Sequence, residues 1–149
     1  MDRDVEVRQE REITGRVLLV EDDAGGAQLM RIAFGERLPL ASLEVVGDGE
    51  QALGAIAEGR LDWDLVLLDL NLPGVPGHDV LAAVRASDDE RVRRLPVVVL
   101  SHSEVEADVE RSYDLGANSH IAKPHSLDKL FEIVDTLGQY WFRVVSLPN

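Results

Sequence analysis

The chain contains no cysteine. This absence excludes disulfides, thiolate metal sites and a cysteine nucleophile, and it suits a protein of the reducing cytoplasm. No apolar run approaches the ~20 residues that a membrane-spanning helix needs, and the first residues, Met1 to Asp4, do not have the character of a signal peptide. We therefore expect a soluble, cytoplasmic protein that does not enter a membrane.

The chain is also poor in positive charge. Its 15 basic residues stand against 28 acidic ones, which gives a formal net charge of −13. Because affinity for nucleic acid comes largely from lysine and arginine on phosphates, we expect no binding to nucleic acid. Most of the acidity is explained by solubility, so only carboxylates that converge on one place need a specific reason.

The length of 149 residues allows one domain with a proper core and leaves no room for a second effector domain. Residues 1–14 mix charges with few apolar side chains, so we expect a flexible tail to which we assign no function. Residues 15–149 are expected to form the domain, including an extended last helix.

Short apolar runs alternate with segments of helical periodicity. We predict strands over residues 15–20, 43–46, 65–69, 96–101 and 119–122. We predict helices over residues 24–34, 49–58, 78–86, 104–115 and from 126 onward. This alternation predicts an α/β fold, a doubly wound parallel sheet of five strands flanked by five helices. We expect the strand order 2-1-3-4-5 of the flavodoxin-like arrangement.

Two details of this interpretation concern the first helix and a connection. Leu29, Ile32 and Ala33 are expected to form the apolar face of the first helix, and Gly35 is expected to end it. Residues 87–94 are expected to be a surface connection.

Polar side chains stand where four of the predicted strands end. Glu21 and Asp22 follow the first strand, Asp69 closes the apolar run 65–68, Ser101 ends the fourth strand and Lys123 follows the fifth. In the order 2-1-3-4-5 these groups meet in one crevice at the carboxyl ends of the strands. Three carboxylates at such short separations repel one another, by about 4 kcal/mol per pair at 4 Å. A hard cation such as Mg²⁺ would relieve this repulsion.

The set of groups suits phosphoryl transfer. It holds a candidate nucleophilic carboxylate, a metal site, and a lysine and a hydroxyl that can fix the transferred group. An aspartyl phosphate is the expected product. The alternative is that these are unrelated polar residues at strand ends, and Asp69 alone could simply start the turn toward Pro73 and Gly74.

The motifs at these strand ends, taken together, resemble the receiver domain of two-component response regulators. They are Val20-Glu21-Asp22-Asp23, Leu68-Asp69-Leu70-Asn71-Leu72-Pro73-Gly74, Leu100-Ser101 and Lys123-Pro124. The resemblance covers nearly all of residues 15–137. It implies that Asp69 accepts a phosphoryl group from a phosphohistidine on a sensor histidine kinase, and that the protein is an enzyme only in its own phosphorylation and autodephosphorylation.

The resemblance also implies roles for the other residues of the crevice. Asp22 and Asp69 would bind Mg²⁺ directly, Asn71 through its backbone carbonyl and Glu21 through water. Ser101 would be the switch hydroxyl. Lys123 would pair with the phosphoryl group and precede a cis bond to Pro124.

The four histidines receive different interpretations. His120 stands where the family often has a switch Tyr or Phe, and the alternative is a half-exposed histidine on an edge strand. His102, beside Ser101, is bulkier than the residue often found there and is expected to affect access of water. His78 and His125 are expected at the surface.

Val75-Pro76 is expected to stiffen its loop.

The end of the chain adds a finer resemblance. Pro96 to Ser101, Ser112 to Asn118 and the ending from Tyr140 to Pro148 are similar to stand-alone regulators that partner phytochrome-type histidine kinases. The resemblance implies a homodimer through the last helix, with the interface residues Tyr140, Trp141, Phe142 and Val145. The alternative is that Trp141 folds back onto its own domain.

Three other functions compete with a response regulator that signals through its fourth helix, fifth strand and last helix. A phosphatase working through an aspartyl phosphate would want an acid two residues after Asp69, where this chain has Asn71. A flavodoxin-like cofactor binder would want a glycine-rich turn rather than Glu21-Asp22-Asp23. A pseudo-receiver scaffold would not need the acids and Lys123.

Overall fold

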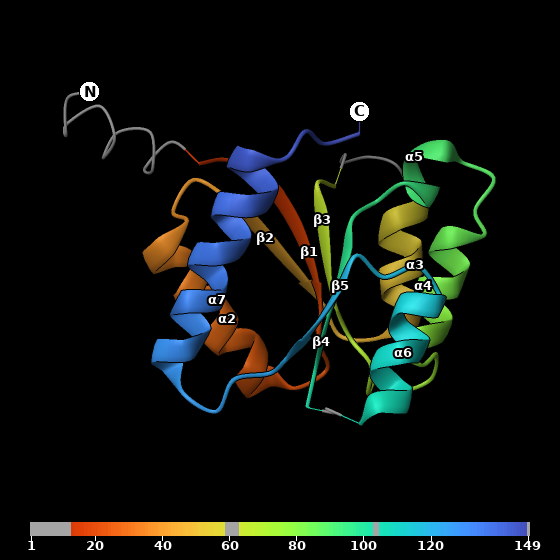
Figure 1. Cartoon of the computed structure of the whole chain (residues 1–149), viewed down its shortest axis with the longest axis horizontal. Helices are drawn as coiled ribbons and strands as arrows, with labels where there is room; N and C mark the ends of the chain where they lie inside the picture. The colour runs from red at the N-terminus through yellow and green to blue at the C-terminus, as the bar shows by residue number, and fades with distance from the viewer. Residues whose placement is uncertain (1–12, 59–62, 103–104, 149) are drawn as a thin grey trace.

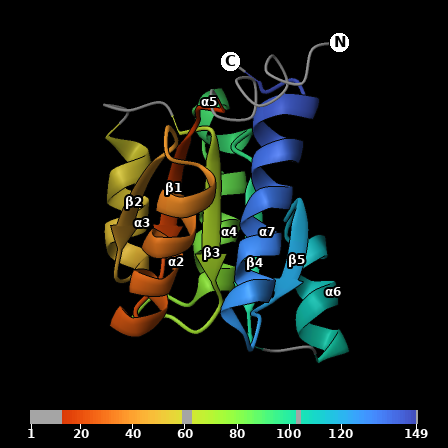
Figure 2. The same cartoon turned by 90° about the vertical axis from the view of Figure 1, so that its left-hand side faces the viewer.

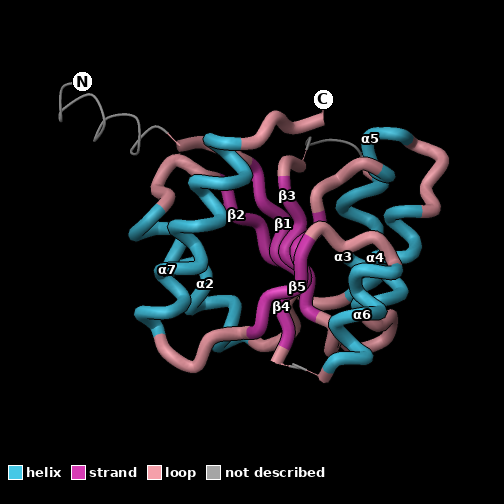
Figure 3. Tube along the Cα trace, viewed as in Figure 1, coloured by secondary structure: helices cyan, strands magenta, loops and turns pink. Residues whose placement is uncertain are grey.

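The computed structural model describes residues 13–58, 63–102 and 105–148. Its centre is one parallel sheet with the strand order β2-β1-β3-β4-β5. The strands are β1 (Arg16–Val20), β2 (Ser42–Val46), β3 (Leu65–Asp69), β4 (Val97–Ser101) and β5 (Ser119–Ala122). Figure 3 shows the strands as the inner layer of the molecule. The predicted sheet and its order are confirmed.

Helices cover both faces of the sheet. They are α2 (Ala24–Arg37), α3 (Gly49–Ala57), α4 (Gly77–Arg85), the single turn α5 (Glu90–Arg93), α6 (Glu106–Asp114) and α7 (Leu127–Gln139), followed by the π-helical turn η1 (Tyr140–Val144). α2 and α7 lie on one side of the sheet and α3, α4 and α6 on the other (Figures 1 and 2). The right-handed crossovers of a parallel sheet produce this doubly wound arrangement.

Each face of the sheet has its own hydrophobic core because successive strand residues point to opposite faces. Val17, Leu19 and Leu67 face α2 and α7, whereas Leu18 and Val66 face α3 and α4. The central strands β3 and β4 are buried along their whole length, which explains why their sequences are apolar without alternation.

The first helix differs from the prediction. It continues through Gly35 to Arg37, and the position of a Gly35 side chain is open, with nothing within 4 Å. Its buried residues are Ala27, Met30, Ala33 and Phe34. Leu29 and Ile32 were predicted in the core but are 47% and 40% exposed. The stripe that packs on the sheet therefore combines two alanines with Met30 and Phe34, and the branched Leu29 and Ile32 lie outside it.

Two other segments differ in detail from the prediction, since a helical turn stands in an expected surface connection and the extended last helix ends in a π-helical turn. The connection 87–94 contains the helical turn α5, capped by the Asp89 carboxylate, which accepts from the Arg91 N–H at 2.9 Å. After α7 the chain widens into the π-helical turn η1, where the Val145 N–H donates to the Tyr140 carbonyl at 3.0 Å. Trp141 and Phe142 of this turn pack against the core on the α2 and α7 side. No helix in the described part of the chain is long and apolar enough to cross a membrane.

Candidate functional site

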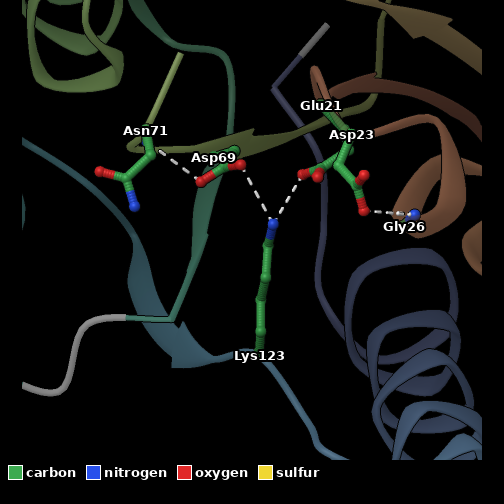
Figure 4. A network of polar contacts seen from close by, with 6 residues as sticks. All are labelled: Glu21, Asp23, Gly26, Asp69, Asn71 and Lys123. Carbon is green, nitrogen blue, oxygen red and sulfur yellow. Dashed lines mark hydrogen bonds and ion pairs between the residues drawn. The ribbon is translucent and has the colours of Figure 1, made fainter.

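The carboxyl ends of β1, β3 and β5 bring one lysine between two carboxylates. Lys123 Nζ lies 2.7 Å from Glu21 Oε2 and 3.0 Å from Asp69 Oδ2 (Figure 4). The side chains of Glu21 and Asp69 are each 5% exposed, and that of Lys123 is 17% exposed. Residues separated by up to 102 positions thus form one buried ion-pair network.

Asp22 completes a group of three acids at this edge of the sheet. One carboxylate oxygen from each of Glu21, Asp22 and Asp69 lies within 4.8 Å of the others, and Asp22 is the exposed member. Oxygen donors at such spacing suit a hard divalent cation, which prefers carboxylates and water. The donor set therefore fits the expected metal site.

A backbone N–H of the loop after β3 holds the carboxylate oxygen of Asp69 that does not face Lys123. The Asn71 N–H donates to Asp69 Oδ1 at 3.1 Å, while the Asn71 side chain points away from the lysine (Figure 4). The Gly77 N–H donates to the Leu70 carbonyl at 3.0 Å, and a side chain at Gly77 would collide with the Asp69 carbonyl oxygen. The loop after β3 is thus folded tightly under the acid, which fixes the direction of its side chain.

Two further polar residues stand at the carboxyl ends of strands, where Asp23 lies between β1 and α2 and Ser101 is the last residue of β4. Asp23 caps α2, with its carboxylate accepting from the Gly26 N–H at 2.9 Å (Figure 4). Ser101 is fully buried at the end of β4, beside Ala122 in the sheet register. Its carbonyl accepts from the Lys123 N–H at 2.8 Å, so the expected switch serine and the lysine share one backbone contact.

The network shifts the pKa values of two of its members. Burial raises the pKa of Glu21 to about 7, against the opposing effect of Lys123, while the nearby Asp69 adds to the increase. Burial lowers the pKa of Lys123, but the hydrogen bonds and charges of Glu21 and Asp69 outweigh it and raise that pKa overall. The lysine is therefore charged at neutral pH, and the raised pKa of Glu21 brings the protonation of this acid into the neutral range.

A cavity of about 590 Å³ opens beside the network, between α2 and the start of α7. Glu21, Lys123 and His102 contribute to its polar end. Its remaining wall is largely apolar and includes Met30 and Leu130. The acid site is therefore accessible to a partner from this side.

Two sequence expectations near the site are wrong. The peptide bond between Lys123 and Pro124 is not cis, since the extended chain after β5 places Lys123 over the acids without it. His78 is not at the surface but 8% exposed, because its Nε2 turns inward to Ser112 Oγ at 3.0 Å. His125 and His102 are exposed.

His120 is half-buried on β5, with Nδ1 3.0 Å from Ser112 Oγ. Neither Ser112 nor its link to His78 was anticipated from the sequence. A serine in an otherwise polar helix carries no signal of burial, and the two histidines are separated from it by 34 and 8 positions.

The residues expected at a dimer interface fall into two groups. Tyr140 is 51% exposed, while Trp141 and Phe142 are half-buried against the core of their own domain. The Phe142 ring lies directly over Gly15. Val145 is half-buried.

The sheet order and the acids at its carboxyl edge define a receiver domain, and the sequence agrees. The response regulator receiver domain family matches residues 17–135. The chain belongs to this family. Receiver domains are phosphorylated by histidine kinases, so membership implies a histidine kinase partner.

Particular relatives refine this assignment. Rcp1, a response regulator of Synechocystis sp., is 34% identical over 137 residues, which are 89% of this chain and 92% of Rcp1. The probable methanogenesis regulatory protein FilR2 of Methanothrix harundinacea is 41% identical over 130 residues, 84% of this chain and 82% of FilR2.

Solved structures show the same similarity. The phosphorylated cyanobacterial phytochrome response regulator RcpA has a TM-score of 0.83 at 35% identity, covering 91% of this chain and 99% of RcpA. The Mn²⁺-bound form of Rcp1 has a TM-score of 0.80 at 33% identity, with the same coverage of 91% and 99%. The chain is thus similar to response regulators of phytochromes over almost their whole length.

Proposed function

We propose that this protein is a single-domain response regulator that takes a phosphoryl group onto Asp69 from a sensor histidine kinase. The observation that carries the proposal is the Lys123 ammonium held between the buried carboxylates of Glu21 and Asp69, at 2.7 and 3.0 Å. A lysine in that place can follow the negative charge when it moves from the carboxylate to a phosphoryl oxygen.

The reaction follows from what each residue can do. An oxygen of the Asp69 carboxylate attacks the phosphorus of the donor phosphohistidine, a P–O bond forms and the P–N bond breaks. The imidazole of the donor leaves with the electron pair and keeps its ring proton. Lys123 stays charged throughout and pairs with the phosphoryl group, and the Ser101 hydroxyl donates to another of its oxygens.

We assign the cation of the acid site to Mg²⁺. Asp22 and Asp69 would hold it directly, Asn71 through its backbone carbonyl and Glu21 through water. When bound, the cation neutralises charge that develops on the phosphoryl oxygens. The all-oxygen donor set supports this assignment, and Rcp1 has been crystallised with another divalent cation, Mn²⁺.

The output of the phosphorylated state is a changed surface of α6, β5 and α7. Ser101 and Lys123 close on the new charge and shift an existing equilibrium between two conformations. His120 on β5 is the proposed switch residue, since it lies between Lys123 and α6. A pseudo-receiver that only scaffolds other proteins is the second candidate, and the intact network of Glu21, Asp69 and Lys123 disfavours it.

We further propose a phytochrome-type kinase as partner and a homodimer through the end of the chain. Similarity to RcpA and Rcp1 over about nine-tenths of this chain supports the partner. The exposed Tyr140 supports the dimer, with Trp141, Phe142 and Val145 behind it.

The central test is the covalent adduct. Incubation with Mg²⁺ and acetyl phosphate should add one phosphoryl group, stable in mild acid and lost in base, and peptide mapping should place it on Asp69. Asp69→Asn should gain none. Asp128→Asn, which alters an exposed acid of α7, is the matched control and should be labelled as wild type.

Two results would contradict the proposal: an adduct on another residue, or none on the wild type. Transfer from phosphorylated kinases then tests the partner separately. A phytochrome-type kinase should label Asp69 faster than an unrelated histidine kinase, and equal rates would remove the phytochrome assignment while leaving the phosphoacceptor in place.

A further inference from the structure

Two histidines and a serine that the acid site does not use meet between α4, α6 and β5. Ser112 of α6 is fully buried, His78 at the start of α4 is 8% exposed, and His120 of β5 is half-buried. His78 Nε2 and His120 Nδ1 each lie 3.0 Å from Ser112 Oγ. One hydroxyl therefore joins three elements, and the two helices lie on the same side of the sheet (Figure 1).

The number of protons available assigns the direction of each hydrogen bond. Ser112 Oγ lies 3.0 Å from the Asp108 carbonyl oxygen, which can only accept, so the hydroxyl donates its one proton there. The two lone pairs of Oγ remain for the imidazoles, and each ring must donate. His78 therefore carries a proton on Nε2 and His120 carries one on Nδ1.

The cluster provides the fully buried contact of helix α6. Among the residues of α6, all of which are described, Ser112 is the buried one. The apolar contacts of this segment are limited to the half-buried Val109 and to Leu115, which follows the helix and packs against the core. Most helices dock through a wider apolar face, so the hydrogen bonds of Ser112 have a larger share in holding α6.

A positive charge on His78 is unfavourable in the docked state. Burial lowers the pKa of His78, and the positive charges of Arg111 and of a protonated His120 act in the same direction. The acid that opposes them is Asp108. His78 therefore remains neutral at pH values where an imidazole in water is already protonated, and it takes up a proton when α4 and α6 separate.

We propose that His78, Ser112 and His120 form a proton-sensitive latch, which holds α6 against α4 and β5 at neutral pH and releases α6 on acidification. The docked state binds fewer protons than the open one, so its advantage is complete above pH 6.5, the ordinary imidazole value. Below it the ratio of open to docked rises by up to about tenfold per pH unit. The latch acts in the unphosphorylated protein.

The test follows the ring nitrogens and the α6 amides of the full chain by NMR from pH 7.5 to 5.0. His78 should show the Nε2–H tautomer and titrate below pH 6.5. Hydrogen-exchange protection factors of α6, corrected for the intrinsic pH dependence, should fall by up to about eightfold between pH 7.0 and 5.5. Protection in α2 should stay constant over this range.

Variants separate the latch from general acid sensitivity. His78→Phe keeps a ring of similar shape without a titrating group, and it should abolish the pH step in α6. His125→Gln, at an exposed histidine, should retain the step. The latch is overturned by a wild-type His78 that titrates at or above 6.5, by α6 protection that does not change with pH, or by a step that persists in His78→Phe. If His78→Phe fails to fold, the wild-type titration decides.

Discussion

Arg85 is a half-buried cation that the described structure pairs with carbonyl and amide oxygens rather than with an acid. Its Nε donates to the Gly116 carbonyl at 2.8 Å, one terminal nitrogen donates to the carbonyls of Arg93 and Leu95 at 2.9 and 2.7 Å, and the other donates to Asn118 Oδ1 at 3.0 Å. Burial lowers the pKa of this guanidinium. The side chain ties the end of α4 to the segments that enter β4 and β5.

We predict that Arg85→Lys lowers the free energy of unfolding by about 2 kcal/mol, because one ammonium cannot reproduce a planar set of four donors and hydrogen bonds to a charged group are worth ~1.5–3 kcal/mol each. Urea unfolding measures the loss. Phosphorylation of Asp69 should not change, since Arg85 lies at the other end of the sheet. Arg91→Lys, at an exposed site, should stay within ~0.5 kcal/mol of wild type, and an equal loss in both variants would refute the explanation.

At the scale of elements, the end of α7 and η1 contribute side chains both to the core of the domain and to an exposed apolar face. Trp141 and Phe142 extend the core toward Gly15, and the Tyr140 and Trp141 rings meet edge to face with centroids 5.2 Å apart. Tyr140 and Val144 remain 51% and 71% exposed. The core contact therefore positions an apolar outer face that a second copy can cover.

We predict that Val144→Glu prevents dimer formation without unfolding the domain, because it places a charge on that outer face. Trp141→Ala should weaken the dimer and also lower the free energy of unfolding, since it removes part of the core. Sedimentation together with urea unfolding distinguishes the two effects. Val105→Glu, at the 62% exposed residue just before α6, should sediment as wild type. A Val144→Glu protein that sediments like wild type would exclude this face as the interface.

For the whole molecule, the acid site couples stability to pH and to divalent cations. The pKa of Glu21 is about 7 in the folded protein against 4.5 ordinarily. A carboxyl whose folded pKa is raised stabilises the fold fully below pH 4.5 and loses that contribution as pH rises to 7. The network therefore has its greatest need for a cation above neutral pH.

We predict that the free energy of unfolding falls by on the order of 3 kcal/mol from pH 4.5 to 7 in wild type relative to Glu21→Gln. Subtracting the pH profile of Glu21→Gln from that of wild type removes the contributions of the other titrating groups to the free energy of unfolding. One of these is His78, whose contribution changes with pH in the opposite direction. Mg²⁺ at a hundredfold excess over Kd should restore about 2.7 kcal/mol at pH 8 and less at pH 5.5, where Glu21 is protonated. Removal by a chelator should reverse this. Parallel pH profiles of the two proteins would contradict the argument.

The sequence predicted an element correctly where the hydrophobicity of its residues alone determines their position in the fold. Leu65 to Asp69 was predicted as a buried strand with an acid at its end because a short apolar run without alternation is typical of a central strand of a parallel sheet, and the structure confirms it. Leu29 and Ile32 were placed wrongly because several apolar stripes fit the same helix. Only contact with the sheet selects among them.

The fold class followed from the sequence, because the period of apolar residues predicts strands that alternate with helices. Once the flavodoxin-like strand order was assumed, the acids had to face one another, because the carboxyl ends of parallel strands share one edge of the sheet. Tertiary structure alone decided that Lys123 bridges Glu21 and Asp69 and that His78 is buried. It also decided that the Ser112 hydroxyl forms hydrogen bonds with two imidazoles. These contacts join residues far apart in the chain. Their energies depend on distance and burial, which no local pattern records.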